Sequence, residues 1–445
     1  MLHGIHTIFP PPSVSGHNGF DPISEGKLEK GEGTWSTTKE ILGWVFDGKR
    51  ATIQLPPPKC EKIITLINKI CNTKRSALRT FQQLAGKLQH ASFGMPGGRG
   101  LFSPLQMAML GDPEFINITT SLKSCLQDWK YIVRFMRENP TSVFQIVLEY
   151  PSYIGYSDAC KLGAGGIWCS GTEALHPFLW QVGWPEDIQR QLVTDDNKNG
   201  SITINDLELA GAVLNWLALE CQQLDLQYMH VGTFCDNTSA VAWAYKLRTS
   251  KSHIAAQLLR ILSIRIHKRK ASGLTPMNIA GEDNKMADVV SRAFKQGEFF
   301  AASQNLTQYF NNHFPLTQNK SWKGFQMPSR LSSLVIASLR GEKLAMESLL
   351  RLPKVEKNTG KLGNTMQQCA EQIHSSSTLV HSNEILSSML SLQGSGKALT
   401  VKEIRSRFKA SQLRCQPYPR PSNWLENHVP FTKKMENPTT SVHND

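Results

Sequence analysis

Cysteine is scarce and scattered in this sequence. Nine cysteines lie among 445 residues, from Cys60 to Cys415, and none forms a Cys-x-x-Cys pair. This pattern argues against a disulfide framework and against a zinc knuckle, and it favours a reducing compartment. No apolar run approaches the roughly 18 residues of a membrane span, and the first residues lack the basic and apolar stretches of a secretory signal. The sequence therefore predicts a soluble protein of the cytoplasm or nucleus, without a membrane partner.

Acidic residues are also in deficit. The chain has 36 Asp and Glu against 49 Lys and Arg, which gives a formal net charge of +13 and a pI near 9.3. An excess of positive charge suits a polyanionic partner such as nucleic acid, although it says nothing about the fold. The length allows about two to four domains with ordinary cores.

Four of the acidic residues share a setting that indicates a metal site. Asp158 and Asp236 each end an apolar run that is typical of a strand, whereas Glu208 and Asp288 each lie early in a predicted helix. Strand ends and first helical turns are where an α/β sheet presents catalytic groups at one edge. Carboxylate oxygens are the hard ligands that magnesium prefers. The sequence therefore predicts that these four carboxylates converge on one site.

Each acid also has a purely structural interpretation. Glu208, three residues after an Asn, fits a capping box in which it would only bond to a backbone N–H. Asp236 with Asn237 fits a turn followed by a helix N-cap, and Asp158 fits the polar start of a glycine-rich hairpin. Asp288 fits a solvated helix residue. The order of all four acids within one domain-sized window favours the metal site.

The segments that carry these acids match a known pattern. They are Tyr156-Ser157-Asp158-Ala159 with Gly163 and Gly165, Asn205-Asp206-Leu207-Glu208-Leu209, Cys235-Asp236-Asn237-Thr238-Ser239-Ala240, and Ala280 to Arg292. This window resembles the ribonuclease H domain of retroelement polymerases, of the LTR type and related retrotransposons. Its last segment is similar to the ending G-x-x-N-x-x-A-D-x-x-S-R, the most specific of the four. The resemblance implies an endonuclease for the RNA strand of RNA·DNA hybrids, with two Mg²⁺ ions held by Asp158, Glu208, Asp236 and Asp288 and with Mn²⁺ able to substitute.

The resemblance extends to the segments before this window. Residues 41–56 are similar to the hairpin that closes a reverse-transcriptase palm, and residues 84–105 are similar to the thumb and connection that follow it. No Tyr-x-Asp-Asp turn precedes the hairpin, and the one Asp-Asp pair, Asp195-Asp196, lies in a polar loop beyond the thumb. The resemblance thus implies a reverse-transcriptase fragment without its palm active site, which is not a competent polymerase alone. A separate palm or the remainder of a polyprotein would be its partner.

The patterns predict an α/β protein in four parts. A poorly ordered segment, 1–34, precedes the palm hairpin and a mostly helical thumb and connection, 35–142. A ribonuclease H-like domain, 143–300, is expected to hold a mixed five-stranded sheet with flanking helices. A C-terminal extension, 301–445, is expected to be partly helical and then loose.

Basic residues that follow the third acid are candidates for phosphate contacts. They are Lys246, Arg248, Lys251, Lys268, Arg269 and Lys270. Their structural alternative is a solvated helix C-terminus, where the helix dipole favours Lys and Arg. A hybrid duplex favours the phosphate role, because it needs backbone contacts beyond the scissile phosphate.

Two other functions remain open on the sequence alone. One is a catalytically silent nucleic-acid-binding remnant of a reverse transcriptase, and the other is a nuclease of the integrase or transposase type, which shares the sheet. The order of the acids argues against the second, because integrases use two Asp and then a Glu on the last helix. Here the Glu comes second and an Asp comes last.

Overall fold

The computed structural model describes residues 26, 29, 34, 36–146, 151–170, 175–249, 252–293, 299–316, 320–342 and 344–351. The described residues from 36 onward belong to one compact unit. The predictions of a poorly ordered N-terminal segment and a loose C-terminal stretch fall almost wholly outside the described residues.

A small four-stranded sheet opens the described part of the chain, with the strand order β1-β2-β3-β6. Its strands are β1 Thr38–Ile41, β2 Trp44–Asp47, β3 Thr52–Gln54 and β6 Thr141–Ser142. Leu42 and Gly43 between β1 and β2 have φ values of 50° and 81°, the left-handed region that a tight hairpin turn uses. Between β2 and β3, Asp47 Oδ1 accepts from the backbone N–H groups of Lys49 and Arg50, both at 3.0 Å. These local bonds form the hairpin that the sequence predicts before residue 57.

Amphipathic helices build the core of the region that follows. Pro57 lies in the first turn of α4, where its fixed φ and missing N–H are tolerated. The isoleucine stripe of α4 is buried, and α5 buries Phe81, Leu84 and Leu88 at the same helical spacing. The elements of this region are α4 Pro57–Cys71, β4 Arg75–Ala77, α5 Leu78–Ser92, η1 Gly98–Leu101, α6 Ser103–Ala108, β5 Phe115–Asn117, α7 Thr120–Glu138 and η2 Val143–Gln145.

The larger sheet is mixed and has the strand order β11-β10-β7-β8-β9-β12. Its strands are β7 Tyr153–Ala159, β8 Gly163–Ser170, β9 Phe178–Gly183, β10 His230–Cys235, β11 Gly273–Asn278 and β12 Lys323–Gln326. β7, β8 and β9 form an antiparallel meander, whereas β10 pairs in parallel with β7, and β11 in parallel with β10. The mixed sheet with its helices confirms the predicted α/β class.

This sheet has one strand more than predicted. β12 pairs in parallel with β9, from Lys323 opposite Phe178 to Gln326 opposite Gln181. Its four residues, KGFQ, are too few and too irregular in hydrophobicity to show the alternation that marks a strand. The expected five-stranded sheet within 143–300 is therefore corrected to six strands, and the sheet extends past residue 300.

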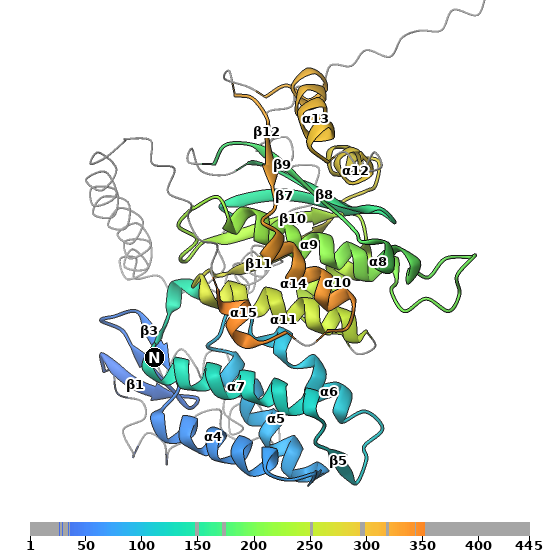
Figure 1. Cartoon of the computed structure of the whole chain (residues 1–445). Helices are drawn as coiled ribbons and strands as arrows, with labels where there is room; N and C mark the ends of the chain where they lie inside the picture. The colour runs from blue at the N-terminus through green and yellow to red at the C-terminus, as the bar shows by residue number, and fades with distance from the viewer. Residues whose placement is uncertain are drawn as a thin grey trace, which may run out of the picture. The chain divides into compact units, whose positions relative to one another are not determined.

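Helices cover both faces of the larger sheet (Figure 1). α12 packs on β7, β8 and β9 from one face, while α9 packs on β7 and β8 from the other. Every residue of α9 from Asp206 to Glu220 is buried, because α9 lies between the sheet and the outer helices α10, α11 and α14. The helices are α8 Glu186–Arg190, α9 Ile204–Glu220, α10 Thr238–Lys246, α11 His253–Lys268, α12 Lys285–Arg292, α13 Phe299–His313, α14 Ser329–Leu339 and α15 Met346–Leu350.

Two buried arginines of α11 join the helical region, the sheet region and the last described segment. Arg260 donates two hydrogen bonds to Asp128 of α7, at 2.6 and 3.1 Å. Arg265, which is 0% exposed, donates to Glu220 at the end of α9 at 2.8 Å. Both guanidinium groups also donate to backbone carbonyls, namely Leu344 O at 3.0 Å, Leu349 O at 3.0 Å and Arg351 O at 2.7 Å. Part of the predicted C-terminal extension, residues 344–351, is therefore packed with the sheet region.

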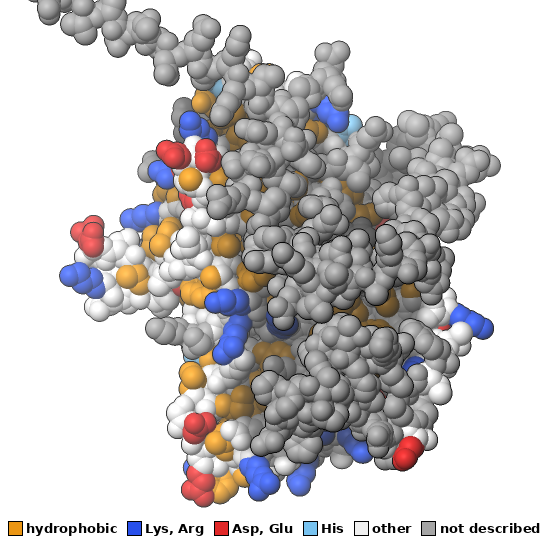
Figure 2. All heavy atoms as spheres, turned by 180° about the vertical axis from the view of Figure 1, so that it is seen from behind, with side chains coloured by type: hydrophobic (Ala, Val, Ile, Leu, Met, Phe, Trp, Pro, Cys, Tyr) orange, Lys and Arg blue, Asp and Glu red, His pale blue; other side chains and the backbone are white. Residues whose placement is uncertain are grey.

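The described surface carries charges of both signs. Figure 2 shows one face, on which basic and acidic side chains alternate along the visible margin with hydrophobic side chains between them. Among the described helices, none combines the length and the apolar character that crossing a bilayer requires.

Candidate metal centre

Asp158 lies on β7, in the middle of the larger sheet. The whole strand is buried, and Asp158 is only 4% exposed. The hydroxyl of Ser291 on α12 donates a hydrogen bond to Asp158 Oδ2. Burial raises the pKa of Asp158 to about 6. The negative charges of Asp236 and Asp288 also raise this pKa, whereas the hydrogen bond from Ser291 lowers it. Asp158 is thus a carboxyl group that is shielded from solvent and has too little positive charge nearby to balance its own.

Glu208 lies in the first turns of α9 but does not cap the helix. The capping box is formed instead by Thr203 and Asp206. Thr203 Oγ1 accepts from the Asp206 N–H at 3.3 Å, and Asp206 Oδ2 accepts from the Thr203 N–H at 3.0 Å. The structural interpretation of Glu208 as a capping residue is therefore wrong. Its carboxylate is buried, and burial, followed by the charges of Asp158 and Asp236, raises its pKa to about 9.

Asp236 follows the last residue of β10 and precedes the helix N-cap Asn237, which is the arrangement that its structural interpretation predicts. Asn237 Oδ1 accepts from the Ala240 N–H at 2.9 Å and so caps α10. Gly281 approaches Asp236 so closely that a Cβ on this glycine would lie 3.2 Å from Oδ2. Burial raises the pKa of Asp236, and the charge of Asp288 adds to this effect. One ligand atom each from Glu208, Cys235 and Asp236 lie within 4.8 Å of one another.

Asp288 completes the group from the first turn of α12. Its side chain is 37% exposed, and its Oδ1 accepts from Arg292 Nε at 2.6 Å. Its charge acts on both Asp158 and Asp236. The structure therefore brings the four predicted acids into one electrostatic cluster, one from each of β7, α9, the end of β10 and α12.

Long-range contacts hold α12 against the sheet beside these acids. Gly165 of β8 lets α12 approach, since a Cβ there would lie 2.6 Å from Val290 Cγ1. Gln181 of β9 donates a hydrogen bond to Val290 O, and Asn284 Nδ2 donates to Ser157 O at 3.2 Å. Gly165, Asn284, Val290 and Ser291 lie in the segments that match the family pattern, but the sequence alone predicts none of these contacts. Gln181 lies outside those segments.

The donor set fits a hard divalent cation. Glu208 and Asp236 supply carboxylate oxygens at metal-ligand spacing. Asp158 and Asp288 lie outside that closest group and are linked to it by the effect of their charges. Cys235 Sγ lies 3.7 Å from Glu208 Oε2 and donates to it, and burial raises the pKa of this thiol well above its usual value. The thiol is therefore a hydrogen-bond donor to the site, and the ligand chemistry is that of oxygen, which Mg²⁺ and Mn²⁺ prefer.

The structure separates the predicted basic residues into two kinds. Lys246, Arg248, Lys268 and Lys270 are exposed, as phosphate contacts require. Arg269 instead binds Glu220, with Nε 2.7 Å from Oε1 and Nη2 2.9 Å from the backbone oxygen. The expectation for Arg269 is therefore corrected, because its guanidinium belongs to the ion-pair network of α11. Lys251 lies outside the described residues.

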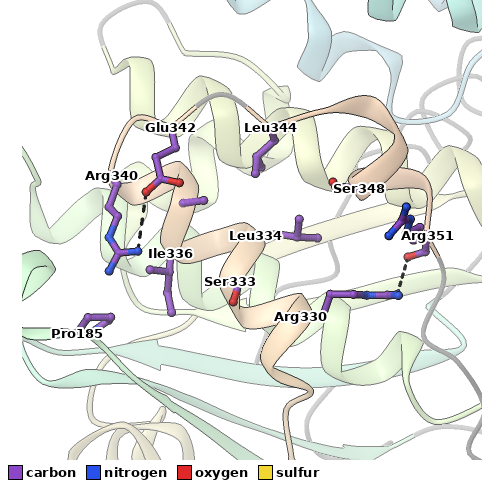
Figure 3. Close-up of a pocket in the computed structure, with 11 residues that line it drawn as sticks. Pro185, Arg330, Ser333, Leu334, Ile336, Arg340, Glu342, Leu344, Ser348 and Arg351 are labelled. Carbon is purple, nitrogen blue, oxygen red and sulfur yellow. Dashed lines mark hydrogen bonds and ion pairs between the residues drawn. The ribbon is translucent and has the colours of Figure 1, made fainter.

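A separate hollow of about 500 Å³ lies beside α14 (Figure 3). Leu334 and other apolar side chains line its middle. Arg340 lies near Glu342 at one end, and Arg330 donates to Arg351 O at the other. Glu342 is the one carboxylate among the described residues that line this hollow. Among its described lining residues, this hollow therefore lacks the group of carboxylates that forms the acid cluster.

Comparisons with known proteins add little to this geometry. No family model and no curated protein matches the sequence. The solved structure of the foamy viral protease-reverse transcriptase in complex with dsDNA matches 45% of this chain and 37% of that chain, at 11% identity and a TM-score of 0.23. The dRH form of that enzyme with DNA matches 55% of this chain and 38% of that one, at 12% identity and a TM-score of 0.23. This chain spans less than two fifths of their length, and a likeness at this TM-score carries no argument about function.

Proposed function

We propose that this chain is a metal-dependent ribonuclease H of retroelement origin, which cleaves the RNA strand of RNA·DNA hybrids. The observation that carries the proposal is the convergence of Asp158, Glu208, Asp236 and Asp288 from four separate elements. Support comes from Glu208, a buried acid whose alternative role as a capping residue fails because Thr203 and Asp206 form the capping box. Buried carboxylates with too little positive charge destabilise one another unless a cation binds.

The four carboxylates would hold the metal ions, and other residues would fix their positions. Bound Mg²⁺ or Mn²⁺ supplies a reactive water and offsets charge on the leaving oxygen. Ser291 orients Asp158 through its hydroxyl, and the buried helix α9 holds Glu208 in place. Exposed lysines such as Lys268 would bind phosphates away from the reacting one. Preference for an RNA strand would come from its 2′-hydroxyl groups and the shape of the minor groove.

The hairpin β2–β3 and helices α4 to α7 correspond to the region predicted as the end of a palm, the thumb and the connection. We propose that they bind the same duplex, and that a separate palm or polyprotein remainder completes a polymerase. The chain alone should then fail to extend a primer with any nucleotide mixture. Primer extension by the purified chain would reveal a polymerase site outside the acid cluster.

A cleavage assay tests the nuclease directly. The full chain is incubated with Mg²⁺ and a labelled RNA·DNA hybrid, duplex DNA or duplex RNA, and we expect cleavage of the RNA strand of the hybrid. Asp158→Asn should abolish cleavage and leave hybrid binding largely intact, because Asn keeps the shape but loses the anionic ligand. Asp283→Asn, at an exposed acid near the start of α12, is the matched control and should retain activity.

Two results would count against the nuclease. Equal turnover by the wild type and Asp158→Asn would place the activity elsewhere. Tight hybrid binding without cleavage in either Mg²⁺ or Mn²⁺ would favour the alternative, a catalytically silent nucleic-acid-binding remnant. Cleavage of duplex DNA in preference to the hybrid would favour an integrase or transposase type of nuclease.

A further inference from the structure

Arg292 is the positive charge that acts on the acid cluster. Its Nε lies 2.6 Å from Asp288 Oδ1, four residues earlier on α12. Its charge lowers the pKa of Asp158 and of Asp236, against the stronger effect of burial on both groups. Among the charges that act on the described acids of the cluster, it is the one basic group. Arg292 is thus a counter-ion for several carboxylates rather than for Asp288 alone.

The position of Arg292 is unusual for a counter-ion because it is open to solvent. Its side chain is 69% exposed, whereas the side chains of Asp158 and Glu208 belong to buried residues. A guanidinium at the rim of the cluster can move away from Asp288 without opening the protein core. It also lies where a polyanion would approach the four acids, and its planar fork suits a phosphate group.

A bound cation would change the balance of charges at Asp288. A divalent ion offsets the negative charge that attracts Arg292, and it repels a guanidinium at close range. The freed guanidinium then has a phosphodiester as its natural partner, at the place where the nucleic acid meets the site. The metal ion and Arg292 thus compete for the Asp288 carboxylate. Arg292 has an alternative partner in the phosphodiester of the nucleic acid.

Resting on the function proposed above, we infer that Arg292 exchanges partners during substrate binding. It binds Asp288 in the metal-free protein, and it binds a backbone phosphate of the nucleic acid once a metal ion occupies Asp288. Arg292 is therefore a substrate-binding residue whose access to the substrate depends on the metal.

The test compares Arg292→Gln with a matched pair elsewhere. Arg190 forms the same i,i+4 ion pair with Glu186 on α8, with side chains 74% and 81% exposed, and α8 contributes no acid to the cluster. Binding of Mn²⁺ to the metal-free full chain is measured by calorimetry without nucleic acid. Binding of the hybrid is measured over a range of salt, both without metal and in Ca²⁺ under conditions in which a gel detects no cleavage.

We expect Arg292→Gln to bind Mn²⁺ about two- to fivefold more tightly, because a competing positive charge is gone. In Ca²⁺ it should bind the hybrid more weakly, with the logarithmic salt slope reduced by about one phosphate contact. Without metal, hybrid binding should equal that of the wild type, because Arg292 is then held by Asp288. Arg292→Lys should keep the salt slope, and Arg190→Gln should change none of these quantities.

The outcomes separate this inference from the proposed function. A wild type that binds neither Mn²⁺ nor the hybrid overturns the proposed function. A wild type that binds both, beside an Arg292→Gln variant with unchanged metal affinity or an unchanged salt slope in Ca²⁺, overturns the exchange alone. Equal weakening of hybrid binding with and without metal also overturns it, because the contact would then not depend on the cation.

Discussion

Two groups of carboxylates in the described part of the chain have their charge treated in opposite ways. Around α11, Asp128 and Glu220 are matched by arginines, with Arg260 on the first and Arg265 and Arg269 on the second. In the acid cluster, one solvent-exposed arginine, Arg292, acts on Asp158, Asp236 and Asp288.

The two groups differ in what they lack. The carboxylates around α11 have cations and hydrogen bonds, so the protein needs nothing from solution to keep them buried. The acid cluster has a deficit of positive charge, and burial raises the pKa of Glu208 to about 9 and that of Asp158 to about 6. In these two groups, the acids with balanced charge join helices together, whereas those with unbalanced charge form the candidate metal centre.

The largest effect should come from breaking the balanced group. Glu220→Ala should lower the free energy of unfolding by about 3–5 kcal/mol, because it leaves two arginines without their carboxylate, one of them fully buried. Denaturant unfolding of the full chain, followed by tryptophan fluorescence, measures this loss. Glu186→Ala removes an exposed partner and serves as the control. A loss no greater for Glu220→Ala than for the control would remove the contrast between the two groups.

The acid cluster should make the metal-free protein less stable as the pH rises. The folded state holds the Glu208 proton up to about pH 9, whereas the carboxyl of the unfolded chain loses it near 4.5. The folded state thus binds more protons between these values, so stability falls with pH, with a slope approaching about 1.4 kcal/mol per pH unit. Denaturant unfolding in EDTA between pH 6.5 and 8 measures the slope, because this interval lies above the pKa of Asp158. Glu208→Gln should flatten it and Glu282→Gln should not.

Metal should relieve the same unbalanced charge. Mg²⁺ at about ten times its Kd should add roughly 1.4 kcal/mol to the stability of the wild type. Asp236→Asn should gain clearly less from Mg²⁺, while in EDTA it should be as stable as the wild type or more so, since one like charge is gone. Thermal unfolding with and without Mg²⁺ checks both statements. If Mg²⁺ leaves the wild-type melting curve unmoved and Asp236→Asn destabilises like a turn mutation, the four acids are not one site.

The smallest expected effect separates the basic residues near the end of α11. Replacing Lys268 and Lys270 by Ala should weaken hybrid binding and reduce its salt slope by up to about two phosphate contacts. Arg269→Ala should leave the slope unchanged and lower stability, because its partner is Glu220. A salt slope that responds to Arg269 and not to the lysines would reverse this assignment.

Regular patterns made much of the fold predictable from the sequence. The strands predicted before Asp158 and Asp236 agree with β7 and β10, because each is a continuous apolar run. The helices predicted around Glu208 and Asp288 agree with α9 and α12. β12 was not predictable in this way. Its place depends on pairing with a strand about 145 residues earlier, from Lys323 to Phe178, rather than on its own four residues.

The candidate site was predictable by type but not by environment. The acids could be named because residue type and strand or helix position are visible in the sequence. The capping box was misplaced because Thr203 and Asn205 are both good N-cap residues, and only the fold decides between them. Ser291 and Asp158 are 133 residues apart, so no local pattern predicts their hydrogen bond. Arg269 looked like a surface cation because nothing near it in the sequence indicates Glu220.

The backbone carbonyls that accept hydrogen bonds from Arg260 and Arg265 affect the order in which the chain packs during its synthesis. They lie 84 to 86 residues after the arginines, so at about 5–20 residues per second the ribosome supplies them roughly 4 to 17 seconds later. Until then, burial of these cations would leave hydrogen-bond donors without acceptors, which is costly. Helix α11 should therefore finish packing late, and nascent chains stalled with residues up to 340 outside the ribosome should be cut by protease in α11, whereas chains exposed to 360 should resist.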